Sequence, residues 1–219
     1  MSKANKSNKA IKYRLYPNDE QKVMFAKTFG CCRFVYNQLL ALQKQRYKDG
    51  ESHLSKLKSN EFATRTLKKD YDFLKEIDKF AVSNAVFHLA DAYDRFFKKQ
   101  NHFPKFKSKR KSKKSYTTNF TNNNILIGKN VIKLPKVGMV KAVIHRLPKD
   151  DWKLKSVTVS QDSVGNYFAS VLFEYEQEDI PSVSKSSTNA IGLDYKSDGL
   201  YMDSNGNKAG VHKYYRESH

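Results

Sequence analysis

The sequence has few residues of the kinds that mark disulfide-rich or zinc-binding proteins. Its 219 residues include two cysteines, five prolines and one tryptophan. The cysteines, Cys31 and Cys32, are adjacent, which suits neither a mutual disulfide nor a zinc clamp built from paired thiols. We therefore expect two small buried thiols and no zinc in this chain.

Long apolar runs are also absent. No stretch approaches the roughly 18 apolar residues of a membrane span, and the polar start MSKANKSNK does not resemble a signal peptide. With 39% hydrophobic and 13% aromatic residues, the chain can nevertheless form a packed core. These features predict a soluble cytoplasmic protein without a membrane partner.

Acidic residues are scarce relative to basic ones. There are 41 Lys and Arg against 22 Asp and Glu, a net charge of +19 that favours a polyanionic partner. The charge is densest from Lys98 to Lys114, where nine Lys and Arg occur without an acid. Phe103, Phe106 and Tyr116 are interleaved with these cations, a combination that suits unpaired bases and phosphates. A solvated basic linker would give the same run of charge.

Apolar periodicity in the first half predicts one strand followed by helices. The strand alternates from Ala10 to Tyr16 and ends at Pro17. Spacings of three and four then predict helices over residues 18–30, 31–48, 60–69 and 79–99. Two helices that meet at Gly30 would suit a helix-turn-helix, although any helical hairpin gives this pattern. Free amides at the start of the last helix, at Asp78, would form a phosphate site.

The periodicity changes to two in the second half. Short strands are predicted over residues 125–127, 131–134, 140–144, 157–159 and 167–175. Together with the first strand they predict an α+β chain with a small OB-like barrel into whose sequence the helical segment is inserted. Asp194 ends a further short strand, as at the start of RNase-H-like nucleases, and a hairpin with an ordinary turn aspartate is the alternative.

Several motifs, in this order and spacing, resemble the N-terminal part of the TnpB/OrfB family, transposase-related RNA-guided nucleases of small insertion sequences. They lie at Tyr13–Pro17, Cys32–Asn37, Asp78–Ala81, Phe103–Ser108, Ser115–Thr118, Leu134–Gly138 and Ile191–Asp194.

The resemblance implies a division of the chain into five parts. Residues 1–16 would be the first strand of a wedge-like barrel, and residues 17–102 a helical recognition lobe. Residues 103–180 would form the barrel with its basic entry segment. A linker at 181–189 would lead to the first strands of an RNase-H-like RuvC domain at 190–219.

The resemblance also makes Asp194 the first catalytic carboxylate and a ligand of Mg²⁺ in a two-metal nuclease site. In the family the second and third acids and a zinc ribbon follow further along the chain, and no matching motif follows Asp194 here. We therefore expect a chain truncated within the RuvC domain that binds nucleic acid but does not cleave DNA alone.

The partners implied are guide RNA from the transposon end and double-stranded target DNA with a short adjacent motif, in a prokaryotic, nucleoid-associated protein. Carried over by position, the expected duplex contacts are Lys79, Phe80, Ser83, Thr121 and Asn122. Charge makes Lys105, Lys107, Lys109, Arg110, Lys113 and Lys114 the expected phosphate contacts, and Tyr116 is expected to stack on a base. A stand-alone regulatory nucleic-acid-binding protein without catalysis would fit the same charge.

Overall fold

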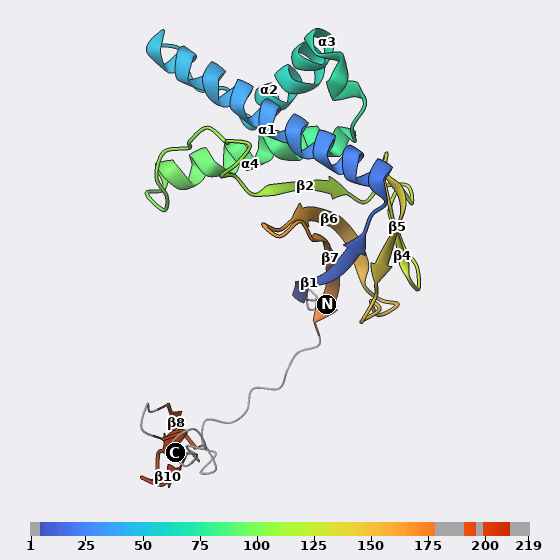
Figure 1. Cartoon of the computed structure of the whole chain (residues 1–219). Coiled ribbons are helices and arrows are strands. Elements are labelled where there is room, and N and C mark those ends of the chain that lie inside the picture. Colours follow the sequence, from blue (N-terminus) through green and yellow to red (C-terminus); the bar gives the residue numbers. More distant parts are fainter. Residues whose placement is uncertain (1–4, 178–190, 196–198, 211–219) are drawn as a thin grey trace, which may run out of the picture. The chain divides into compact units, whose positions relative to one another are not determined.

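The computed structural model describes residues 5–177, 191–195 and 199–210, which belong to two compact units divided after Gln177 (Figure 1). The predicted linker at 181–189 lies outside the described residues. In the described part, no helix is both long enough and apolar enough to cross a membrane.

The first unit consists of a strand, a helical segment and six further strands. Strand β1 spans Asn5–Tyr16. The helical segment comprises α1 (Asp19–Lys48), α2 (Lys56–Glu61), the π-helical η1 (Phe62–Leu67), α3 (Lys68–Asp70), the 3-10 helix η2 (Asp72–Lys75) and α4 (Lys79–Phe97). The later strands are β2 (Lys114–Asn119), β3 (Leu126–Ile127), β4 (Val131–Leu134), β5 (Gly138–Val143), β6 (Lys153–Gln161) and β7 (Tyr167–Gln177).

All seven strands form one antiparallel sheet in the order β2-β6-β7-β1-β5-β4-β3. Strand β1 pairs with β7 from Asn5↔Gln177 to Leu15↔Tyr167 and with β5 at its end, at Arg14↔Val143. The first strand therefore lies in the middle of the sheet, between strands that come late in the sequence. This confirms the α+β class and a helical segment inserted after the first strand.

The sheet is curled. Its edge strands β2 and β3 follow one another in sequence and are joined only by residues 120–125. Seven flat strands at the usual spacing would separate the two edges by about 29 Å. The seven peptide steps from Asn119 to Leu126 span about 25 Å at most. The sheet must therefore bend back on itself, although the hydrogen-bonded order is open between β2 and β3.

Helix α1 corrects the prediction of two helices that meet at Gly30. It is one continuous helix of 30 residues, opened by a capping box between Asn18 and Gln21. Side chains of this helix are buried on both sides of Gly30, among them Phe29 and Cys32. A helical glycine costs only about 1 kcal/mol. The packing outweighs that cost, so the helix does not break at Gly30, and the expectation of two helices that meet there is wrong.

Helices α1 and α4 pack on each other and on β2 (Figure 1). The Cys32 thiol donates to the Ala81 carbonyl at 3.4 Å across the helix pair. From α4, the Asn84 amide donates to the Thr117 carbonyl at 3.0 Å and so fixes the helix to β2. These contacts make the helices and the sheet a single packed unit.

The second unit is described over three short strands: β8 (Leu193–Asp194), β9 (Tyr201–Asp203) and β10 (Lys208–Ala209), in the antiparallel order β10-β9-β8. Asp194 ends β8, as predicted, and it pairs with Met202 of β9. The Asp203 carboxylate closes the next turn by accepting from the backbone N–H groups of Asn205 and Asn207. The assignment of this unit to a RuvC domain stays a prediction.

Candidate nucleic-acid interface

A groove of about 430 Å³ opens where α4 begins. Its helical side carries Lys68, Lys75 and Lys79, from α3, η2 and α4. Its sheet side is formed by the loop at residues 120–125 and by the turn that holds Lys136 between β4 and β5. We call this feature the lysine groove, after its four lysines.

Four of the five predicted duplex contacts line the lysine groove. Lys79 and Phe80 come from the start of α4, and Thr121 and Asn122 come from the loop after β2. The fold thus brings together residues about forty positions apart in the sequence. Ser83 is half-buried one turn further along α4 and does not line the groove. Contact of these residues with DNA stays a prediction.

Sequence reasoning missed the other three lysines of the groove. Lys136 lies inside the motif Leu134–Gly138, which carries part of the family resemblance, but it reaches the groove from a turn of the sheet that is far in the sequence from α4. Lys68 lies in a helical region that the sequence predicted only as one weak helix at 60–69, and the structure extends that region over residues 56–70. Lys75 lies beyond it, in η2, which the sequence did not predict. No local pattern marks any of the three as facing the same space.

The sheet side of the groove is held in a defined backbone conformation. Asn122 and Lys136 have φ values of 45° and 64°, in the left-handed region that asparagine tolerates and lysine disfavours. The Asn124 side chain fixes the loop, accepting from the Thr121 N–H at 2.8 Å and donating to the Asn119 carbonyl at 2.9 Å. Left-handed lysine costs about 1 kcal/mol or more, so the placement of Lys136 at the groove is maintained by the surrounding turn.

The start of α4 differs from the open phosphate site that the sequence predicted. Asp78 is buried, and its carboxylate caps the helix by accepting from the Ala81 N–H at 3.2 Å. An anion in the groove would therefore meet a carboxylate beside the helix amides, and its attraction must come from the lysines. Burial lowers the pKa of Lys68, and the neighbouring Asp78 carboxylate partly offsets that effect.

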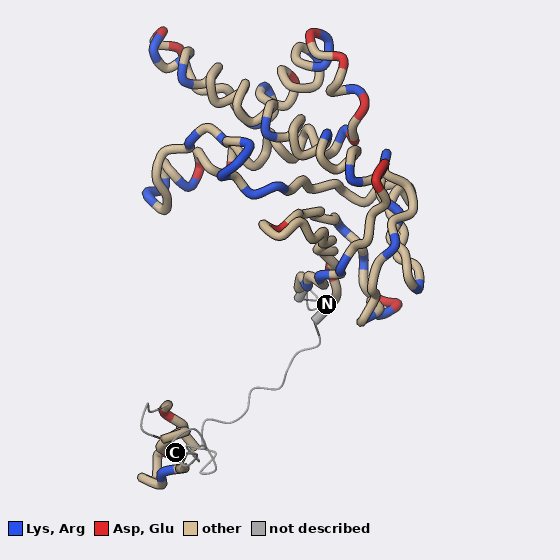
Figure 2. Tube along the Cα trace, in the orientation of Figure 1, with Lys and Arg blue, Asp and Glu red and all other residues tan. Residues whose placement is uncertain are grey.

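The basic segment, residues 98–114, runs from the end of α4 to the start of β2 (Figure 2). Helix α1 anchors it, because the Lys107 N–H donates to the Asn37 side-chain oxygen at 2.8 Å and the Asn37 amide donates to the Lys107 carbonyl at 2.9 Å. Five of the six predicted phosphate contacts are exposed along the segment: Lys105, Lys109, Arg110, Lys113 and Lys114.

Lys107 is the exception among the predicted phosphate contacts. Its ammonium lies 4.0 Å from the centre of the Tyr36 ring, and burial lowers its pKa. The side chain is therefore packed against α1. The structure corrects its assignment from a free phosphate contact to an anchor of the basic segment.

The structure also corrects the prediction that Tyr116 stacks on a base. Only 3% of Tyr116 is exposed, and its ring packs against Phe25 and Phe29 with centroid distances of 6.3 and 5.9 Å. Strand alternation places this side chain on the face of β2 that α1 covers. Burial raises its pKa, and its hydroxyl has no hydrogen-bond partner among the described residues.

The remaining predicted site residues concern metals and thiols. Asp194 is exposed at the end of β8. The described ranges contain no group of three His, Cys, Asp or Glu residues placed to hold a metal ion. Cys31 and Cys32 are buried free thiols, as expected, and burial raises their pKa values to about 11 and about 12.

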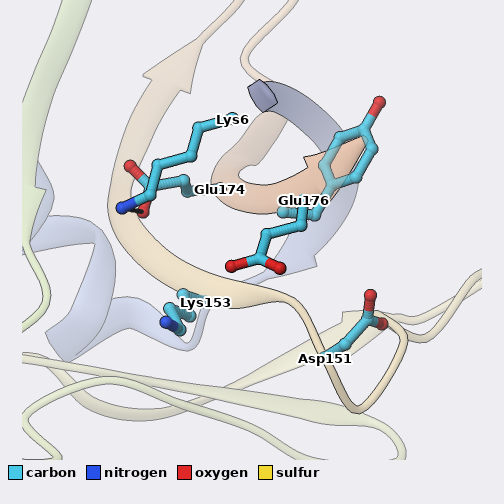
Figure 3. Close-up of a pocket in the computed structure, with 6 residues that line it drawn as sticks. Lys6, Asp151, Lys153, Glu174 and Glu176 are labelled. Carbon is cyan, nitrogen blue, oxygen red and sulfur yellow. Dashed lines mark ion pairs between the residues drawn. The ribbon is translucent and has the colours of Figure 1, made fainter. Parts of the chain in front are cut away.

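A smaller pocket of about 90 Å³ lies beside β1, β6 and β7 (Figure 3). Lys6, Asp151, Lys153, Glu174 and Glu176 line it, and Lys6 pairs with Glu174 at 3.5 Å. Glu174 also pairs with a lysine on the neighbouring strand. The closest charges thus satisfy one another across paired strands, and the pocket contains no residue predicted to act on nucleic acid.

Residues 7–52 match a family model described as the helix-turn-helix domain of IS605-type OrfB proteins. In the structure this range covers most of β1 and all of α1. It therefore consists mainly of one strand and one continuous helix.

Three curated proteins are similar to the chain. A Streptomyces pristinaespiralis protein provisionally named RNA-guided DNA endonuclease is 30% identical over 202 residues, which cover 91% of this chain and 49% of that protein. InsQ of Escherichia coli K12, with the same provisional name, is 30% identical over 192 residues, or 84% of this chain and 44% of InsQ. The virulence protein VsdF of Salmonella dublin is 32% identical over 111 residues, or 46% of this chain and 93% of VsdF. The chain spans about half the length of the first two relatives.

Proposed function

The chain belongs to the TnpB/OrfB family, and from this premise we propose that its described residues are the nucleic-acid-binding half of an RNA-guided DNA endonuclease. In this proposal the curled sheet is the OB-like wedge barrel, and β8 to β10 begin a RuvC domain. The observation that carries the proposal is the convergence of four lysines with Thr121 and Asn122 in one groove.

The lysine groove suits the backbone of a DNA duplex. Its lining includes four lysines, of which Lys75 pairs with the neighbouring Asp72. Asp78 is the acid of the lining, and its carboxylate is occupied in capping α4. Phosphates bound by such lysines position a duplex without reading its sequence. Asn122 is exposed at the same groove and offers both a donor and an acceptor. In our proposal, therefore, the lysines hold the duplex, and Asn122 contacts bases of the motif next to the target.

The basic segment suits the guide RNA. Its exposed cations extend over residues 105–114, and Asn37 fixes the main chain of the segment in the middle of that run. An anchored row of cations binds phosphates with a smaller entropic cost than a free tail. We assign the RNA backbone to this surface and the duplex to the lysine groove.

Cleavage requires Mg²⁺ ligands in addition to Asp194. One aspartate cannot hold the two metal ions of a RuvC-type site, and the described residues contain no group of three His, Cys, Asp or Glu side chains that could hold a metal ion. We propose that Asp194 supplies the first ligand of such a site and that the 219-residue chain binds DNA without cutting it. Mg²⁺-dependent cleavage by the purified chain, lost in Asp194→Ala, would contradict this proposal.

The duplex assignment is tested by fluorescence anisotropy with a labelled DNA duplex over a series of salt concentrations. Replacing Lys79 and Lys136 by alanine should lower the slope of log affinity against log salt by about two units, since each lost phosphate contact contributes about 0.9. The matched control is Lys129→Ala/Lys149→Ala, which removes the same charge at two exposed lysines that lie outside the basic segment and do not line the groove. Equal slopes for the two double variants would refute a specific role of the groove.

A further inference from the structure

A second, chemically different groove lies at the other end of α4. It has a volume of about 650 Å³ and is lined mainly by aromatic side chains, including Tyr47 from α1 and Tyr93, Phe97 and Phe103 from α4 and the basic segment. We call it the aromatic groove. Along α4, Phe97 is about 27 Å from Lys79, so the two grooves are separate sites.

The rings of the aromatic groove form a fixed floor with exposed walls. Tyr93 is 4% exposed and contacts His53, Phe97 and Phe103 at centroid distances of 4.5, 6.2 and 5.6 Å. In contrast, Tyr47 is 84%, Phe97 64% and Phe103 40% exposed. Exposed aromatic rings gathered in one hollow are typical of a surface that binds a partner.

The charge around this groove is positive. The Lys44 ammonium lies 5.4 Å from the Phe103 ring centre, and Lys48 is also part of the lining. The acid in the lining is Glu51, which pairs with Arg46. Burial lowers the pKa of His53, so its ring is neutral at physiological pH and adds an aromatic face rather than a charge.

An occupant must therefore combine flat apolar faces with negative charge. Unpaired nucleotides have both, since each base has a π-face and each linkage carries a phosphate. Paired bases in a duplex are stacked inside the helix and do not present their faces to aromatic side chains. The groove also adjoins the basic segment through Phe103, so a strand whose phosphates follow that segment can place its bases here.

We propose that the aromatic groove binds unpaired bases of a single-stranded nucleic acid, with Tyr47 and Phe97 as stacking surfaces. This inference rests on the proposed function and deepens it, because it assigns single-stranded and double-stranded nucleic acid to opposite ends of α4. Stacking on aromatic faces is tolerant of sequence, so the groove selects for strandedness rather than for a particular base.

The test compares two labelled probes on the full chain: a short oligouridylate and an abasic strand with the same number of phosphates. Tyr47→Ala and Phe97→Ala should each weaken oligouridylate binding by roughly 10-fold, the effect of losing one stacked base. Because no charge is removed, the salt slope and the affinity for the abasic strand should be unchanged. Tyr47→Phe should bind like the wild type, and so should Phe73→Ala, which removes an aromatic residue that is 41% exposed and lies outside the groove.

The proposal is overturned if both alanine variants bind oligouridylate as tightly as the wild type, or if the wild type binds the two probes equally. It is also overturned if Tyr47→Ala alters self-association in sedimentation experiments while leaving oligouridylate binding intact, because the groove would then be a protein interface. Measuring duplex binding of Lys79→Ala/Lys136→Ala on the same preparations separates the two claims. If Lys79→Ala/Lys136→Ala lowers the salt slope of duplex binding while Tyr47→Ala and Phe97→Ala leave oligouridylate binding unaltered, only this inference is refuted.

Discussion

Replacing Asn37 by alanine removes the two hydrogen bonds that fix the basic segment to α1. The Lys107 N–H and carbonyl bond to this one side chain at 2.8 and 2.9 Å. Each hydrogen bond contributes about 0.5–1.5 kcal/mol, so Asn37→Ala should lower the free energy of unfolding by about 1–3 kcal/mol. The effect on hydrogen exchange at Lys107 should be easier to detect than the change in global stability, since the Lys107 amide loses its acceptor.

Hydrogen exchange of the Lys107 amide is the assay of choice. A decrease of about 1–3 kcal/mol in the free energy of local opening makes exchange about 5- to 150-fold faster in Asn37→Ala than in the wild type. Asn37→Asp is the matched variant, because its carboxylate keeps the acceptor for the Lys107 N–H and loses only the donor to the carbonyl. The amide of Ser108, which donates to the Ser112 hydroxyl at 2.9 Å, is the internal reference.

The order expected for Lys107 exchange is wild type slowest, then Asn37→Asp, then Asn37→Ala. Unchanged exchange of the Lys107 amide in Asn37→Ala would refute the anchoring role of Asn37. Faster exchange of Lys107 and of the reference amide by the same factor would show general loosening rather than loss of a specific anchor.

Three further experiments test individual side chains. Lys109→Ala should lower the salt slope of RNA binding by about one unit, whereas Lys107→Ala should lower stability and leave the slope unchanged; equal slope losses would contradict the packing of Lys107 on Tyr36. Cys31 and Cys32 have pKa values of about 11 and about 12, against an ordinary value of 9.0. At about pH 8 they should therefore react with a chromogenic thiol reagent at least ~100-fold more slowly in the native chain than in the urea-unfolded chain. Fast labelling of the native chain would show that the thiols are accessible. The buried hydroxyl of Tyr116 lacks a hydrogen-bond partner in the described structure. Tyr116→Phe should therefore leave the free energy of urea unfolding unchanged or raise it by up to about 1 kcal/mol. A large loss of stability would reveal a hydrogen bond that this structure does not contain.

Local periodicity in the sequence predicts the elements better than it predicts their boundaries. Alternation identifies β1 at Ala10–Tyr16, and the structure extends this strand back to Asn5 because β7 is long enough to pair with it. Spacings of three and four identify α4, whose start at Lys79 agrees with the prediction. The break expected at Gly30 fails because the packing of α1 against α4 and β2 is not visible in a local window.

The candidate sites show the same division between local and non-local information. Charge and spacing single out Lys107 and Tyr116 together with exposed neighbours, but they do not reveal that α1 covers both side chains. Similarly, Lys136 lines the lysine groove from the turn between β4 and β5, far in the sequence from Lys79. A run of cations or aromatics in sequence therefore predicts a type of surface, and the fold decides which members of the run remain on it.

The most direct measurement is to express the chain together with the DNA that flanks its gene, purify it at moderate salt and sequence the RNA that accompanies it. We expect a single RNA species that maps to the end of the insertion sequence. This RNA should be lost when Lys105, Lys109, Arg110 and Lys113 are replaced together by alanine. Heterogeneous cellular RNA, or no RNA, would contradict the proposal that the described residues hold a guide.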